Sequence, residues 1–137
     1  MKINPIIAIA VLAALPFIAP LNAISQTIAS SPPVVVKTFP EAGAKDVAPG
    51  EVEIKVTFSK EMADNSWSWA SAWKDSNPEM IGEPKYDSDH KTCVIKVKLE
   101  PGKTYGYWLN SQSFHAFRDK QGHPAVPYLL VFQTATQ

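Results

Sequence analysis

The sequence predicts an all-β domain, an antiparallel sandwich of about seven strands behind an N-terminal export signal. Short runs in which apolar and polar residues alternate with a period of two recur along the chain. Turn-forming clusters rich in Gly and Pro separate these runs, and the 12 prolines are spread along the chain. No run beyond the N-terminal segment shows the 3.6-residue period of an amphipathic helix, so short strands are expected throughout.

The first 23 residues have the composition of a secretory signal peptide. Lys2 supplies a positive charge, residues 6–21 are nearly all apolar, and small residues follow them. We expect cleavage near residues 23–25. Two prolines interrupt the apolar run, which argues against a permanent membrane helix. The alternative is an uncleaved anchor, because no charge occurs between Lys2 and Lys37.

The signal peptide implies an exported protein, in the periplasm, the cell envelope or the extracellular space. Residues 24–33, ISQTIASSPP, have the composition of a flexible lead-in. Residues 34–137 are then long enough for one modest hydrophobic core. We therefore expect a single sandwich domain over residues 34–137, with membrane contact only through the signal segment if it stays uncleaved.

The predicted strands differ in how many apolar faces they present. In chain order they are residues 34–40, 51–58, 66–73, 92–99, 104–110 and 126–134. The runs 51–58, 92–99 and 104–110 place their apolar side chains on one face. The run 126–134 is apolar on both faces, as in an interior strand. Residues 87–90, DSDH, stand where a hairpin would turn.

Residues 65–73, NSWSWASAW, hold three of the four tryptophans. On a strand, Trp67, Trp69 and Trp73 share one face, opposite a face of small residues. The core has to gain its stability from packing, because Cys93 is the only cysteine and no intramolecular disulfide can form. We expect Cys93, Trp67 and Trp69 to be buried, whereas Trp73 at the end of the run fits core and surface equally well.

Three motifs occur in a fixed order between residues 34 and 134. The first is P-x-x-G-A-x-x-V-x-P, an alternating strand and T-F-S-x-x-M, present as Pro40, Gly43, Ala44, Val47, Pro49, Thr57, Phe58, Ser59 and Met62. The second is present as Leu99, Pro101, Gly102, Thr104 and Tyr105. The third is D-x-x-G-N-P, present as Asp119, Gly122 and Pro124, with His123 in place of Asn. Together they resemble bacterial Ig-like domains of the SbsA type, first associated with S-layer proteins.

The resemblance implies an Ig-like β-sandwich that serves as a spacer, connector or adhesive module in exported proteins. It implies no catalytic residue, and we expect no cofactor. Tyr105, just after a Pro-Gly turn at the start of a strand, suits a tyrosine corner, in which the hydroxyl bonds to upstream backbone.

The charge balance and motif content disfavour nucleic-acid binding and catalysis. The chain has 13 basic and 13 acidic residues, so it lacks the basic excess of a nucleic-acid-binding protein. No G-x-S-x-G motif occurs, and nothing in the sequence sets a nucleophile beside a histidine. We expect a non-catalytic protein, with a hydrolase as the remote alternative.

Two groups of residues have the chemistry of metal ligands. One group is Asp87, Asp89 and His90, and the other is His115, Asp119 and His123. For the first group a polar hairpin turn is the favoured interpretation, and for the second a solvated loop. We therefore predict no metal site.

The candidate contact residues are Trp73, Trp108, Phe114, His115 and Arg118. Trp108 alternates away from the apolar face of its predicted strand, and Phe114 lies in the last loop. Arg118 is expected either to pair with Asp119 or to line a ligand groove with Trp73 and Trp108. We expect the partner to be another envelope or extracellular protein. The alternative is a polysaccharide bound by the exposed tryptophans.

Overall fold

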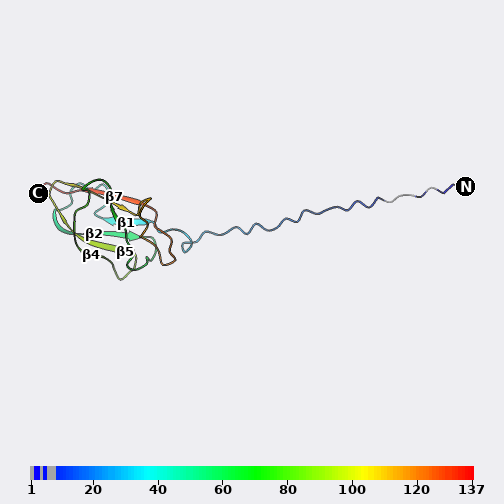
Figure 1. The fold of residues 1–137 in the computed structure, drawn as a ribbon, viewed down its shortest axis with the longest axis horizontal. Coiled ribbons are helices and arrows are strands. Elements are labelled where there is room, and N and C mark those ends of the chain that lie inside the picture. Colours follow the sequence, from blue (N-terminus) through cyan, green and yellow to red (C-terminus); the bar gives the residue numbers. More distant parts are fainter. Residues whose placement is uncertain (1, 4, 6–8) are drawn as a thin grey trace.

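The computed structural model describes residues 2, 3, 5 and 9–137, which form seven strands in two antiparallel sheets (Figure 1). The strands are β1 (Val35–Phe39), β2 (Gly50–Phe58), β3 (Trp69–Ser71), β4 (Glu79–Tyr86), β5 (Thr92–Leu99), β6 (Thr104–Leu109) and β7 (Tyr128–Gln133). The strand order is β1-β2-β5-β4 in the first sheet and β3-β6-β7 in the second. This is the order of constant-type immunoglobulin domains, so the predicted Ig-like sandwich is confirmed.

The inward faces of β2, β5 and β6 follow the predicted alternation. Their core-facing residues are Ile54, Val56, Phe58, Cys93, Ile95, Val97, Leu99, Tyr105, Tyr107 and Leu109, all of them buried. β2 and β5 pair along their whole length, with Ile54 opposite Ile95 and Val56 opposite Cys93. The predicted inner faces of these strands are therefore confirmed. A shift of one residue in the pairing would move every one of these side chains to the solvent face.

β7 differs from the prediction of an interior strand. It is the last strand of its sheet, and Leu129 on its outer face is 41% exposed. Its outer edge is nevertheless bonded, because Gly43 N and Val47 N donate to the carbonyls of Val131 and Gln133. The segment between β1 and β2 thus covers the backbone edge of β7, while the apolar outer face stays uncovered.

β4 is a strand that the sequence did not predict. Neither of its faces is consistently buried, and its register with β5 shifts between Ile81 and Lys85, around Gly82. The predicted turn at residues 87–90 joins β4 to β5. There the Asp89 carboxylate accepts hydrogen bonds from Lys91 N at 2.9 Å and from Thr92 N at 2.9 Å. Because Asp89 is engaged in this way, the first candidate metal group is a structural turn.

Four aromatic rings from distant parts of the chain pack together between the sheets. The ring centroids of Trp69 and Tyr107 lie 5.3 Å apart, and those of Phe58 and Phe117 lie 5.0 Å apart. Trp69 also meets Phe117 edge-on at 5.7 Å. In immunoglobulin domains with the inter-sheet disulfide, the second cysteine lies two residues after the tyrosine of the corner. Tyr107 holds that position here and fills it with an aromatic ring.

The predicted tyrosine corner is present at Tyr105. Its hydroxyl accepts a hydrogen bond from Glu100 N at 2.8 Å, across the turn that precedes β6. Two residues later, the hydroxyl of Tyr107 is buried without a hydrogen-bond partner among the described residues. Burial also raises the pKa of Tyr107, which keeps the phenol neutral.

The N-terminal segment leaves the sandwich at one end, and the C-terminus lies at the opposite end (Figure 1). Of the predicted signal peptide, Met1, Asn4 and residues 6–8 lie outside the described residues, and residues 9–23 are extended and exposed. Within the described part of the chain, no helix has the length and apolar character that crossing a membrane requires.

Part of the lead-in is bonded to the domain. Residues 24–26 are extended, whereas Thr27 to Ser31 form a turn, with Ser31 N donating to Thr27 O at 3.0 Å. Lys60 Nζ donates to Ala29 O at 2.9 Å and also to Ser31 O. Pro33 is buried, and its carbonyl accepts from Val126 N. The chain is thus held against the sandwich from residue 27 onward.

The two core tyrosines give opposite expectations for the loss of a hydroxyl. Tyr105→Phe removes the corner hydrogen bond and should lower the free energy of unfolding by about 1–2 kcal/mol. Tyr107→Phe removes a buried hydroxyl that has no partner, so it should be neutral or stabilise by up to about 1 kcal/mol. Urea unfolding of both variants and the wild type measures these free energies. An equal loss of stability in the two variants would contradict the different roles given to the two hydroxyls.

Cys93 should be inert in the folded protein. Its side chain is fully buried, and burial raises the pKa of its thiol to about 12, so almost no reactive thiolate forms at neutral pH. A maleimide reagent is expected to label Cys93 only after denaturant unfolds the domain, as followed by mass spectrometry. Labelling of the native protein within minutes would show that the register of β5 is wrong.

Candidate interaction surface

Trp73 lies in a turn and not on a strand with the other tryptophans. β3 ends at Ser71, and the turn that follows is fixed by the buried Ser76. The Ser76 hydroxyl donates to Gly106 O at 2.8 Å and accepts from Ala72 N at 2.9 Å. This turn carries Trp73 to the outer side of the sheet β3-β6-β7, where it is 44% exposed. The predicted strand face shared by Trp67, Trp69 and Trp73 is therefore wrong, because Trp67 precedes β3 and Trp73 follows it. Trp67 and Trp69 pack against the core, but they are half-buried and not fully buried as expected.

The Trp73 ring rests directly on Gly106 of β6. A Cβ atom at Gly106 would lie 2.4 Å from a carbon of that ring, closer than any side chain tolerates. Gly106 points outward because Tyr105 and Tyr107 on either side of it point into the core. Only a residue without a side chain allows the indole to lie against the sheet at this position.

Trp108 lies on the same outer face, two residues further along β6. It faces outward as its place in the predicted alternation required, and it is half-buried. In the sheet it stands between Ala70 of β3 and Leu129 of β7. We call the outer face formed by Trp73, Trp108, Leu129 and Val131 the tryptophan strip.

A hollow of about 430 Å³ opens at the Trp108 end of this strip. Its described lining consists of Trp108, Ser111, Gln112, Ser113 and Pro127. We call it the Trp108 hollow. None of these lining residues carries a charge, so the hollow offers one aromatic ring and several neutral polar groups.

A second hollow, of about 440 Å³, lies beside the following loop. Its described lining consists of Trp67, Ser68, Ser113, Phe114, His115, Ala116 and Arg118. We call it the Phe114 hollow. Ser113 lines both hollows. Of the five candidate contact residues, Phe114, His115 and Arg118 line the Phe114 hollow. Trp73 and Trp108 lie on the tryptophan strip.

The loop 111–117 between the two hollows is fixed by Asn110, a residue that the sequence did not single out. Asn110 is fully buried with φ of 58°, a left-handed conformation that Asn tolerates. Its amide Nδ2 donates to the carbonyls of Phe117 and Ala125, and its Oδ1 accepts from Phe117 N. The exposed Phe114 is therefore carried by a loop whose base is hydrogen-bonded and buried. An Asn that ends a strand before a loop is the only sequence signal for this role.

Asp119 anchors the second half of this region. Its carboxylate is buried and accepts from Lys60 Nζ at 2.6 Å and from His123 Nδ1 at 2.9 Å. Burial alone would raise the pKa of Asp119, but the hydrogen bonds from Lys60 and His123 together outweigh it and lower the pKa to about 2.

Arg118 does not pair with Asp119, which was one of the two arrangements predicted for it. Its Nη1 donates instead to Gly122 O at 3.0 Å, and its side chain is exposed.

The second candidate metal group is divided between two places. His123 is bonded to Asp119, whereas His115 lines the Phe114 hollow. Across the residues that the structure describes, no three His, Cys, Asp or Glu side chains gather as a metal site.

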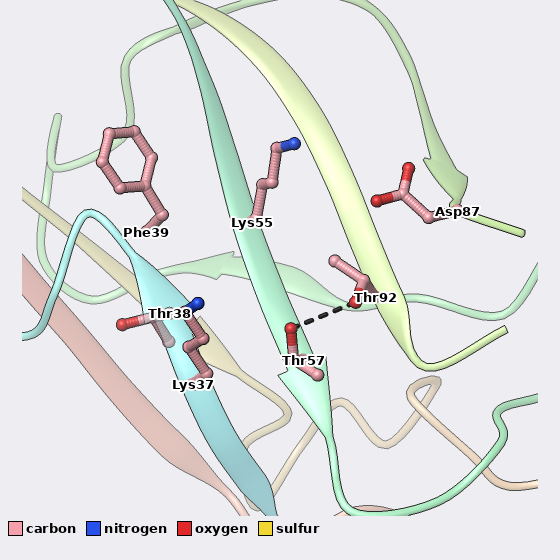
Figure 2. Close-up of a pocket in the computed structure, with 7 residues that line it drawn as sticks. All are labelled: Lys37, Thr38, Phe39, Lys55, Thr57, Asp87 and Thr92. Atoms are coloured by element: carbon pink, nitrogen blue, oxygen red, sulfur yellow. Dashed lines mark hydrogen bonds between the residues drawn. The ribbon is translucent and has the colours of Figure 1, made fainter. Parts of the chain in front are cut away.

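A third hollow lies on the outer face of the other sheet and has a different character. Figure 2 shows it over β1, β2 and β5, with Phe39, Lys37 and Lys55 around a Thr57–Thr92 hydrogen bond. Its volume is about 500 Å³, and its walls carry charges of both signs, because Asp87 also lines it. Such a mixed, charged surface is ordinary for the solvated face of a sandwich.

Asp119 should make the domain sensitive to acid. Its folded pKa of about 2 lies below the unfolded value of 3.8, so the carboxylate stabilises the fold above pH 4. About 2 kcal/mol of that stabilisation should be lost as the pH falls from about 4 to 2. The Asp119→Asn variant should have a lower free energy of unfolding than the wild type at pH 7. Its free energy of unfolding should also change less between pH 4 and 2. Urea titrations at several pH values test this, and the exposed Asp46→Asn should behave as wild type.

Comparisons with known proteins place this fold in a family. The model of the bacterial Ig-like domain matches residues 29–134. Among solved structures, the crystal structure of the S-layer protein rSbsC(31-844) superposes with a TM-score of 0.51 at 16% sequence identity, a likeness that shows the fold alone. That match covers 80% of this chain and 14% of the S-layer chain, so this chain spans a small part of its length. No curated protein matches the chain. Because the family model covers most of the sequence, as the motifs predicted, the protein belongs to the bacterial Ig-like domain family.

Proposed function

We propose that this protein is an exported, non-catalytic Ig-like module that works by noncovalent contact with another protein of the cell envelope or the extracellular space. The observation that carries the proposal is Phe114, a large apolar side chain that is 60% exposed on a loop with a buried, hydrogen-bonded base. A structural or adhesive role needs such a contact surface and no catalytic group.

The loop geometry favours binding because it lowers the entropy that association would cost. Ser111 Oγ accepts from Phe114 N at 3.1 Å, and Ser111 N donates to Phe114 O at 2.8 Å, which closes a tight turn. The backbone that carries Phe114 is therefore already ordered before any partner binds. Rigid aromatic side chains beside a hollow are typical anchors of protein interfaces.

The chemistry of the Phe114 hollow indicates the kind of partner side chain it accepts. Trp67 and Phe114 provide apolar contact, and Arg118 provides a positive charge at the rim. A partner loop with an apolar residue next to a carboxylate would match both features.

Export is supported by the composition of the N-terminal segment. A basic start, an apolar run and small residues after it are the features of a signal peptide. Exported domains often carry disulfides, whereas this chain has only Cys93, so in an oxidising compartment its fold depends on packing alone. The periplasm, the envelope surface and the extracellular space all fit these observations.

Carbohydrate binding is the second candidate function. The observation that favours it is that Trp73 and Trp108, which are far apart in the sequence, share one outer face of the sheet β3-β6-β7. Aromatic rings that reach solvent on one face of a sheet are suited to stacking against sugar rings as well as to protein contact.

A site-specific cross-linking experiment tests the contact with a protein. A photoreactive phenylalanine analogue replaces Phe114 in one variant and Phe39, 54% exposed on the opposite sheet, in the control. In cells, position 114 should cross-link to one defined envelope protein, and position 39 should give none. Binding of that protein, once purified, should weaken about tenfold or more in Phe114→Ala.

The same experiment can refute the proposal. If positions 114 and 39 give the same products, the loop has no specific protein partner. If the purified partner binds Phe114→Ala as tightly as the wild type, the Phe114 hollow is not the contact surface.

A further inference from the structure

We propose that the Trp108 hollow, together with the Trp73 ring, binds an uncharged polysaccharide chain that runs along β6. This inference makes the second candidate function, carbohydrate binding, more specific. It rests on the proposed function only because both require a module that binds noncovalently. It assigns a ligand class to one surface and hydrogen-bonding roles to Ser111 and Gln112.

The first step of the argument is that the Trp73 ring is held in a fixed position. Ser76 bonds the turn to Gly106 O, and Gly106 N donates to Ser76 O at 2.9 Å. The ring itself lies against Gly106, so it cannot sink further into the sheet. A sheet that only needed to cover its surface would not require a glycine at this point, whereas a flat, preordered ring is what sugar stacking requires.

The second step is the spacing of the two rings. Gly106, beneath Trp73, and Trp108 are two residues apart on one strand face, roughly 7 Å along β6. An extended ligand lying along the strand therefore meets both rings with different units of its chain. A single sugar would reach one ring, so affinity should rise with chain length.

The third step concerns hydrogen-bonding capacity that the fold leaves unused at the Trp108 hollow. Ser111 Oγ accepts hydrogen bonds from Ser113 N and Phe114 N, which leaves its own O–H available to donate. Gln112 is exposed, and its amide makes no hydrogen bond with any described residue. An amide offers both donors and an acceptor, which is the requirement for binding hydroxyl groups.

Charge decides between ligand classes. The described lining of the Trp108 hollow is neutral, in contrast to Arg118 in the Phe114 hollow and the lysines in Figure 2. A neutral site beside an aromatic ring matches a molecule with hydroxyl edges and apolar C–H faces. An apolar side chain of a protein would instead bury Ser111 and Gln112 without hydrogen-bond partners, which is unfavourable.

The test is affinity electrophoresis of the full chain in a zwitterionic detergent, with soluble polysaccharides in the gel. Neutral β-glucan, mannan and xylan are compared with anionic polygalacturonate. At least one neutral polymer should retard the wild type, and the anionic polymer should not. Trp108→Ala should weaken the retardation about tenfold or more, and Gly106→Ala, which must displace the Trp73 ring, should also weaken it.

Controls separate this proposal from the protein contact and from misfolding. Phe114→Ala should keep the full retardation, and Gln112→Ala, which changes only an exposed side chain, should reduce it without changing the urea midpoint. Failure of every neutral polymer to retard the wild type overturns the proposal. So does unchanged retardation of Trp108→Ala, or an equal loss in Phe114→Ala. Cross-linking of Phe114 to a protein can fail without affecting any of these results.

Discussion

The absence of a possible disulfide is the constraint on which the rest of this sandwich depends. Phe117 of the last loop bridges the two sheets, because its ring contacts Phe58 of β2 and Trp69 of β3. Trp69 also packs against Tyr107 of β6 within its own sheet, which makes three ring contacts. At about 1 kcal/mol for each pair beyond its burial, these contacts contribute about 3 kcal/mol. That is close to the stabilisation of about 2–4 kcal/mol that a disulfide typically gives. Aromatic packing therefore replaces the covalent link between the sheets.

The same ring cluster also determines where the candidate surface lies. Phe117 belongs to the cluster and to the end of the loop 111–117, so the loop is fixed to the core at its far end and to Asn110 at its start. Between these two anchors the chain turns outward and exposes Phe114. Lys60 and Asp119 then join this region to the end of β2 and to the lead-in. The exposed Phe114 thus stands on a part of the domain that is connected to the core, to the end of β2 and to the lead-in.

The strands β2, β5 and β6 could be predicted from the sequence, because each carries an unbroken row of large apolar residues at every second position. β4 could not, because Gly82 and a register shift interrupt its pattern and neither face is consistently buried. The positions of Trp73 and Trp108 on one face depend on pairing between residues 30 or more apart, which no local pattern shows. Asn110 was missed because its hydrogen bonds to Phe117 and Ala125 form only once the loop has folded back on itself, and no local pattern of residues shows that.

The two outer faces of the sandwich differ in a way that the fold alone does not require. An uncovered sheet face normally carries polar residues, and the outer face of β2 does so with Glu51, Glu53 and Lys55. The outer face of β6 and β7 carries Trp108, Leu129 and Val131 instead, and the edge of β7 is bonded by Gly43 and Val47. Backbone pairing with another chain is thereby blocked at that edge, while the apolar side chains stay accessible. A face protected against strand addition but not against side-chain contact fits the recognition role proposed above, which an inert spacer would not need.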